Sequence, residues 1–241
     1  MVISWNKYSS LTFLSIIFLI HIIKSCDIPS DLWCDSYESA KRCDVIQQCD
    51  RFRRMKLPIK LSLYYEALCP YCQRFISNHL GIIYNQFRGL IELEMIPWGN
   101  SKLLQNGTIR CNHGSIECNA NKLQSCVLEY AKMKHALAFI ICFERSLNDV
   151  DVESAFRHCS GFIRNHYARI RRCYDSERGT QLQRKAFYHT LSASPNRISE
   201  VPYLLINGYS SNPDSNNLNI HALQLLLKKW KRIFRNNYSI K

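Results

Sequence analysis

Twelve cysteines in 241 residues constrain this chain more than any other feature. Their chemistry depends on the redox compartment, and the amino terminus indicates which one that is. A lysine precedes a largely apolar run, Leu11 to Ile20, which is closed by His21 and Lys24. This layout is typical of a secretory signal peptide with Ser25 as the last residue removed, and the run is short for the alternative, an uncleaved membrane anchor. A secreted chain folds in an oxidising lumen, so we expect most cysteines to be paired, and an even number fits complete pairing.

The rest of the composition agrees with a secreted globular protein. No other segment is long and apolar enough to cross a bilayer, so we expect no membrane span in the mature protein. Two sequons, at Asn106 and Asn237, agree with passage through the secretory pathway. The formal net charge is +13, with basic clusters at 51–56, 169–172 and 228–232. We interpret these clusters as solvated helix faces and expect no nucleic acid, which a secreted cysteine-rich protein seldom meets.

Three parts are expected along the chain. Residues 1–25 are the signal peptide. Residues 26–56 form a short segment with four cysteines and few aliphatic side chains, too small for a core of its own size, and so dependent on disulfides. Residues 57–236 are predicted to form one α/β domain, interrupted at about 99–195 by a helical insert that carries four further cysteines, Cys126, Cys142, Cys159 and Cys173. Within the insert, residues 121–147 have the pattern of one long helix.

The order of elements predicts the fold class of this domain. We expect a buried strand at 59–65, an amphipathic helix that begins at Pro70, and a second strand within 89–99, which together make a parallel β-α-β unit. After the insert, an apolar run follows Pro202, and Asn207-Gly208 then signals a hairpin before a final helix. The apolar face of that helix is predicted to include Leu218, Ala222, Leu225, Leu226 and Ile233. The order β-α-β, helical insert, β-β-α is the connectivity of a thioredoxin-like fold.

The pair Cys69 and Cys72 falls between the first strand and the first helix. At a helix start, free N–H groups and the helix dipole stabilise a thiolate, the form that attacks disulfides. We therefore predict that an exposed Cys69 attacks and that a more buried Cys72 resolves the mixed disulfide. A zinc site would need a second such pair, which the chain lacks, and a structural disulfide across two residues is geometrically awkward. No nucleophile elbow or paired histidine points to a hydrolase.

Val201-Pro202 stands immediately before the third predicted strand. In a thioredoxin-like fold a cis-proline at this place packs opposite the two cysteines, and the backbone before it can bind an extended peptide. We therefore predict a cis bond and a substrate-binding role for Val201 and Pro202. The alternative is an ordinary trans proline at a strand entry.

The stretch "CNHGSIECNANKLQSC" carries a resemblance to a known family. It resembles the signature of the gamma-interferon-inducible lysosomal thiol reductases, with asparagine in place of the glutamine at position 112, and the resemblance extends over roughly residues 57–235. The residues that match the signature in type and spacing are Cys111, His113, Gly114, Glu117, Cys118, Asn121 and Cys126. More weakly, residues 31–49 resemble the saposin A-type segment that accompanies some members.

The resemblance implies an enzyme that reduces protein disulfides in the endosomal–lysosomal pathway and so aids unfolding and proteolysis. Cys69 and Cys72 would be its redox pair, reset by an external thiol, with no cofactor or metal. His113 and Glu117 would then shape a disulfide-bonded loop near the active face. Three alternatives stay open: a disulfide oxidase, an isomerase of the secretory lumen or outside the cell, and a secreted thioredoxin-like binding protein.

Overall fold

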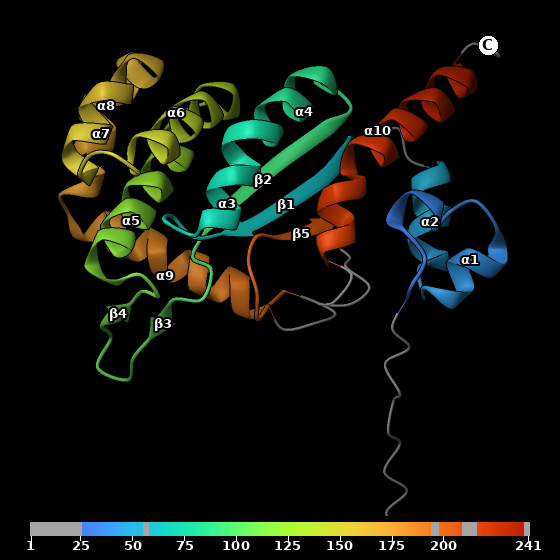
Figure 1. Ribbon diagram of the computed structural model, residues 1–241, viewed down its shortest axis with the longest axis horizontal. Helices are drawn as coiled ribbons and strands as arrows, with labels where there is room; N and C mark the ends of the chain where they lie inside the picture. Colours follow the sequence, from blue (N-terminus) through green and yellow to red (C-terminus); the bar gives the residue numbers. More distant parts are fainter. Residues whose placement is uncertain (1–25, 55–57, 194–197, 209–215, 239–241) are drawn as a thin grey trace, which may run out of the picture.

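A small mixed sheet lies at the centre of the molecule in the computed structural model, which describes residues 26–54, 58–193, 198–208 and 216–238 (Figure 1). The predicted signal peptide lies outside these residues. The three strands are β1 (Ile59–Tyr65), β2 (Ile91–Pro97) and β5 (Tyr203–Ile206), in the order β2-β1-β5. β2 runs parallel to β1 and β5 runs antiparallel to it. The three predicted strands are confirmed.

Both faces of the sheet are buried, which explains why β1 reads as an almost continuous apolar run. Leu61, Leu63 and Tyr65 pack into the main core. Tyr64 points to the opposite face, where it belongs to a second core cluster with Ala186 of α9 (Glu177–Leu191). Helices therefore cover both faces, and the carboxyl end of β1 is held from both sides.

The helical segment after β1 begins where the sequence predicted. It comprises α3 (Pro70–Phe75), a π-helical turn (Ile76–Leu80) and α4 (Gly81–Gln86). Its predicted apolar face is buried and consists of Phe75, Ile76, Leu80, Ile83 and Phe87. Gly81 is where this segment passes closest to α6 (Met133–Ser146), because a side chain there would collide with Ile141.

The segment between β2 and β5 is a helical insert, as predicted. After a short hairpin, β3 (Lys102–Leu103) and β4 (Ile109–Arg110), it contains α5 (Gly114–Tyr130), α6, α7 (Val152–Cys159), a 3₁₀ segment (Ser160–His166), α8 (Tyr167–Tyr174) and α9. The single long helix expected over 121–147 is wrong: Ala131 and Lys132 adopt extended backbone conformations between α5 and α6. Neither residue is glycine or proline, so the sequence carries no signal for this break.

Five disulfides join ten of the twelve cysteines. The sequence could not give this connectivity. Three disulfides lie in the insert: Cys111–Cys118, Cys126–Cys173 and Cys142–Cys159. Cys126–Cys173 joins α5, which packs on β2, to α8 across 47 residues and so cross-links two helices of the insert.

The carboxyl-terminal helix, α10 (Asn216–Tyr238), packs against β5. Its buried side chains are Leu223, Leu226, Leu227 and Trp230, whereas Leu225, predicted to face the core, is 60% exposed. The helix is therefore rotated from the predicted orientation. Asn207 and Gly208 have φ values of 52° and 76°, as a tight hairpin turn requires, but the second strand of that hairpin lies outside the described residues.

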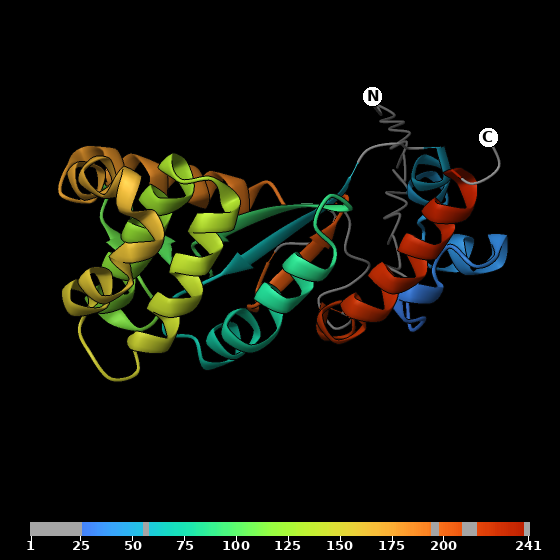
Figure 2. The ribbon, with the colours of Figure 1, turned by 90° about the horizontal axis from the view of Figure 1, so that it is seen from above.

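The amino-terminal segment packs beside α10 (Figures 1 and 2). It contains a 3₁₀ turn (Ser30–Leu32), α1 (Tyr37–Arg42) and α2 (Ile46–Arg54), cross-linked by Cys26–Cys43 and Cys34–Cys49. Lys229 of α10 reaches the carboxylate of Asp35 and the carbonyl oxygen of Asp31. Among the residues described, no helix combines the length and apolarity that crossing a membrane requires.

Candidate active site

Cys69 and Cys72 are the two free cysteines of the described chain. Cys69 is the N-cap residue of α3, with Pro70 in the first turn, where a missing N–H costs nothing. Cys72 is fully buried one turn later, as predicted, but Cys69 is only 6% exposed and the expectation of an open nucleophile is wrong. Tyr71, between them, is 69% exposed. The side chain of Tyr71 is therefore far more exposed than that of Cys69 beside it.

The Val201-Pro202 turn covers Cys69. The peptide bond between these residues is cis, as the sequence predicted. The Sγ atom of Cys69 lies 3.8 Å from the carbonyl oxygen of Val201. Two segments 132 residues apart in sequence therefore meet at the reactive sulfur, and this contact accounts for the small exposure of Cys69.

The pKa values of the two thiols are shifted in opposite directions. A hydrogen bond from the Cys72 thiol, together with the backbone N–H groups of Cys72 and Tyr71, lowers the pKa of Cys69 from 9.0 to about 7, although burial and the charge of Glu66 oppose the change. Burial raises the pKa of Cys72 well above its usual value, and the neighbouring Cys69 and Glu144 raise it further. Cys69 is therefore the thiol that ionises first and Cys72 the one that keeps its proton.

The backbone before Cys69 is held in an uncommon conformation. Leu68 has a φ of 67°, in the left-handed region that a branched aliphatic residue seldom adopts. The preceding N–H, of Ala67, donates to Oδ1 of Asn121 at 2.9 Å inside the protein. Because this contact anchors the chain two residues before Cys69, it helps to place the cysteine at the start of α3.

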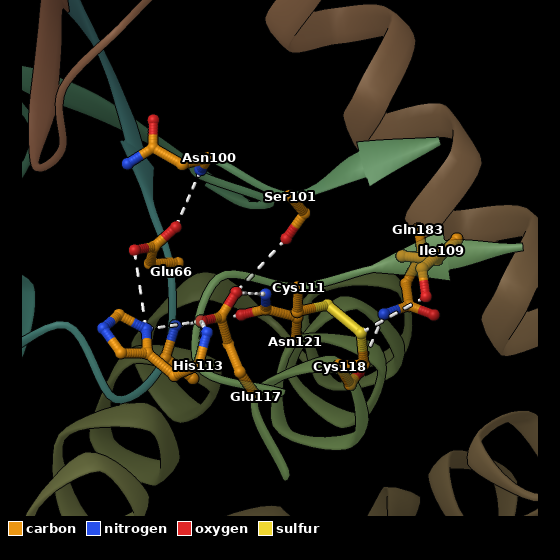
Figure 3. Close-up of a disulfide and its surroundings, with 11 residues drawn as sticks. Glu66, Asn100, Ser101, Ile109, Cys111, His113, Glu117, Cys118, Asn121 and Gln183 are labelled. Atoms are coloured by element: carbon orange, nitrogen blue, oxygen red, sulfur yellow. Dashed lines mark hydrogen bonds and ion pairs between the residues drawn. A yellow bond between two sulfur atoms is a disulfide. The ribbon is translucent and has the colours of Figure 1, made fainter. Parts of the chain in front are cut away.

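Other signature residues, among them His113 and Glu117, lie beside Asn121 (Figure 3). The buried carboxylate of Glu117 accepts from the backbone N–H of His113 at 2.7 Å and lies 2.5 Å from Nδ1 of the same histidine. Nδ1 of His113 also lies 3.6 Å from the carboxylate of Glu66, which accepts from the N–H of Asn100 at 2.7 Å. His113 thus joins two buried carboxylates, and burial raises the pKa of Glu66.

The other signature residues form the frame of this loop. Cys111 and Cys118 are disulfide-bonded, and Gly114 starts α5 with a φ of 81°, which explains why glycine suits that position. Cys126 pairs with Cys173 outside the loop. The prediction that the signature shapes a disulfide-bonded loop near the two cysteines agrees with this arrangement.

The side chains of Glu66, His113 and Glu117 also have the chemistry of metal ligands, with donor atoms within 4.8 Å of one another. However, both oxygens of Glu117 already accept hydrogen bonds, from His113 on one side and from Ser101 and Asn121 on the other. The arrangement is thus satisfied as a hydrogen-bonded cluster. In a second group, Cys142 and Cys159 are bonded to each other and cannot ligate beside His158.

Sequence reasoning missed a buried polar chain behind Cys72. The Tyr65 hydroxyl donates to Oε1 of Gln124 at 2.6 Å, and Nε2 of Gln124 donates to Oε1 of Glu144 at 2.6 Å. Glu144 is fully buried, its Oε2 has no hydrogen-bond partner among the described residues, and burial raises its pKa to about 7. In the sequence this residue looks like part of the polar face of a helix, so nothing identified it.

The Asn121 contact gives a first testable expectation. Replacing Asn121 with alanine leaves the buried N–H of Ala67 without its acceptor, so the free energy of unfolding should fall by about 1–3 kcal/mol. Denaturant unfolding under non-reducing conditions measures this change. Asn119→Ala, on an exposed position of the same helix, is the matched control and should change stability by less than about 0.5 kcal/mol. Equal stability of Asn121→Ala and Asn119→Ala would show that the hydrogen bond between Ala67 and Asn121 does not stabilise the fold.

Comparison of the sequence with those of known proteins shows the family of this chain. A sequence profile described as gamma interferon inducible lysosomal thiol reductase (GILT) matches residues 60–163, which include both free cysteines and the whole signature. A gamma-interferon-inducible lysosomal thiol reductase of Carassius auratus is 31% identical over 191 residues, 77% of this chain and 73% of that protein. GILT-like protein 2 of Drosophila melanogaster is 26% identical over 188 residues, 76% of this chain and 87% of that protein. The chain belongs to the gamma-interferon-inducible lysosomal thiol reductase family.

Proposed function

We propose that this protein reduces disulfide bonds of polypeptide substrates through Cys69 and Cys72. The observation that carries the proposal is the pair itself: two free thiols at the start of a helix, one with its pKa lowered to about 7 and the other fully buried beside it. A nucleophile and a resolving thiol need this difference in acidity and burial. The thiol reductase names of the relatives agree with it.

The reaction transfers two electrons in two exchanges. The Cys69 thiolate attacks one sulfur of the substrate disulfide, and the other sulfur leaves as a thiolate and takes a proton from water. Cys72 then loses its proton and attacks Sγ of Cys69, which releases the second substrate sulfur. The substrate has gained two electrons and two protons, and the enzyme holds a Cys69–Cys72 disulfide. An external thiol reduces this disulfide by the same exchange in reverse.

The lowered pKa of Cys69 increases the fraction of thiolate present in acid. At pH 5 a thiol with a pKa of about 7 is ionised in about one molecule in a hundred, compared with about one in ten thousand for a pKa of 9.0. The N-cap position of Cys69 and the neighbouring Cys72 therefore support a gain in thiolate of about a hundredfold. The names of the relatives, lysosomal thiol reductases, support a site of action in the endosomal–lysosomal pathway.

The connectivity supports a thioredoxin-like domain. β1, α3 and β2 form a parallel β-α-β unit, and β5 joins the sheet next to β1, directly after the cis Val201-Pro202 bond. Cys69 lies between β1 and α3, Cys72 lies in the first turn of α3, and Sγ of Cys69 is 3.8 Å from the carbonyl oxygen of Val201, which precedes that bond. On this reading the backbone of Val201 would pair with an extended substrate segment beside Pro202.

The route to the compartment is also a proposal. The predicted signal peptide places the chain in the secretory pathway, where Asn106 would be glycosylated: it is exposed in the turn between β3 and β4. The side chain of Asn237 is outside the described residues. The division into residues 26–56 and 57–236 stays a prediction, as does the saposin A-type likeness, since the family profile begins at residue 60.

Replacing Cys72 with serine tests the mechanism. The variant should attack a disulfide-bonded protein through Cys69 but be unable to resolve the adduct, so a covalent mixed disulfide should accumulate to nearly one per enzyme. Non-reducing electrophoresis and intact mass spectrometry measure the adduct. The control is the Cys69→Ser/Cys72→Ser double variant, which should form none. Equal adduct in both variants, or none in either, would contradict the assigned roles.

A further inference from the structure

A groove of about 880 Å³ runs beside the two cysteines. One wall is the segment from α3 to α4, and the other is formed by residues 199–202 and α10. Its apolar side chains include Phe75, Ile83 and Pro202. Tyr71, between the cysteines, lines the groove, and so does Val201, whose carbonyl oxygen is 3.8 Å from Sγ of Cys69, so a polypeptide held there passes close to Cys69.

Three basic side chains lie among the polar residues that line this groove. Arg74 and His79 lie on the first wall, and His221 lies on the opposite wall, on α10. All three are exposed, and none has a hydrogen bond or an ion pair with another described residue, although the ring of His79 stacks on Phe75. The lining thus offers up to three cationic groups that have no counter-ion among the described residues.

Few other titratable groups face these side chains. Glu200 is the one acidic side chain among the described residues that line the groove, and the phenol of Tyr71 is the other titratable group on the lining. Glu66 is near the groove but buried, and its carboxylate is bound by the backbone of Asn100. Among the described residues that line it, the groove therefore has three basic side chains and one acidic side chain.

Acid pH favours this charge balance. Histidine side chains generally become charged below about pH 6.5, whereas aspartate and glutamate in an unfolded chain keep their charge down to about pH 4. Between these values a histidine and an acidic side chain in general carry opposite charges. The net formal charge of +13 on the whole chain adds a long-range attraction for acidic segments.

We propose that the groove selects, in acid, substrate segments that carry aspartate or glutamate next to their disulfide cysteine. This inference rests on the proposed function and names the class of substrate that the same site prefers. Arg74 supplies the part of the selection that does not depend on pH, and His79 and His221 supply the part that grows as the pH falls. Acidic side chains bind the rims while the neighbouring apolar residues of the segment cover Phe75 and Ile83.

Three disulfide-linked peptides that differ only in the residues flanking the cysteine test this inference. The flanks are Glu, Gln or Lys, and kcat/KM for reduction is measured at pH 5 and pH 7 at low salt. Wild-type protein should prefer the Glu peptide over the Gln peptide by about fivefold at pH 5 and by about twofold at pH 7, as expected for a few exposed charge pairs. The Lys peptide should be the slowest of the three at pH 5.

Variants of Arg74 and of the two histidines separate their contributions to the preference for the Glu peptide. His79→Gln/His221→Gln should lose the pH-dependent part of the preference, whereas Arg74→Gln should reduce the preference equally at both pH values. His135→Gln, on an exposed position of α6 away from the groove, is the control and should behave as wild type. Equal wild-type rates on all three peptides at pH 5 would overturn this inference alone. Failure of wild type to reduce any of them would overturn the proposed function as well.

Discussion

Replacing Cys69 with serine should lower the rate of disulfide reduction by at least about a thousandfold. A serine hydroxyl keeps nearly the same shape at the start of α3 but is not ionised in this pH range and does not form a mixed disulfide. The contacts that lower the pKa of Cys69, from the Cys72 thiol and the N–H groups of the first helical turn, then have no thiolate to stabilise. Steady-state reduction of a fluorescent disulfide substrate at pH 5 measures the loss.

The comparison needs a control for the fold. Cys69→Ser should keep the wild-type fold, because serine is nearly isosteric with cysteine and its hydroxyl can take the place of the thiol beside the carbonyl oxygen of Val201. Asn78→Ser, an exposed substitution in the same helical segment, should retain full activity. Substantial residual reduction by Cys69→Ser would show that another thiol, and hence another mechanism, carries the reaction.

Replacing Glu144 with glutamine should remove much of the loss of stability that we expect as the pH rises from 5 to 7.5. The folded protein holds the proton of Glu144 up to about pH 7, because burial raises the pKa from 4.5. The unfolded chain releases it near pH 4.5, so between these values it binds fewer protons than the folded state and the free energy of unfolding falls as the pH rises. From pH 5 to 7.5 the fall from this group is about 2–3 kcal/mol.

Glutamine at this position is neutral at both pH values and can keep the contact with Gln124. The difference in unfolding free energy between pH 5 and pH 7.5 should therefore shrink by about 2–3 kcal/mol in Glu144→Gln. Urea unfolding of the oxidised protein measures this difference. Glu38→Gln, on the exposed surface of α1, is the control and should leave the difference unchanged. An unchanged pH dependence in Glu144→Gln would mean that the carboxyl is not protonated in the folded state.

The elements next to the active site could be predicted from the sequence because each has a local cause. The apolar run of β1, the proline that starts α3 and the Asn-Gly turn after β5 are all short-range signals. The position of the cysteines between a strand and a helix follows from the same signals. The cis bond at Pro202 was predicted from its place before a strand.

Features that depend on tertiary contacts could not be predicted. The break at Ala131 and the rotation of α10 that exposes Leu225 arise from packing against other elements. The small exposure of Cys69 results from its contact with Val201, which is distant in sequence. Glu144 is likewise buried only because α6 packs against the core around Tyr65 and Cys72.

The direction of disulfide exchange at pH 5 shows whether the dithiol reduces its substrates, as we propose, or oxidises them. Reduced protein is mixed with denatured, disulfide-bonded ribonuclease, and the free thiols of each partner are counted by alkylation and mass spectrometry. Our account predicts two new thiols on ribonuclease for each Cys69–Cys72 pair that becomes oxidised. It would be contradicted if ribonuclease gained no thiols while the oxidised protein introduced disulfides into reduced ribonuclease.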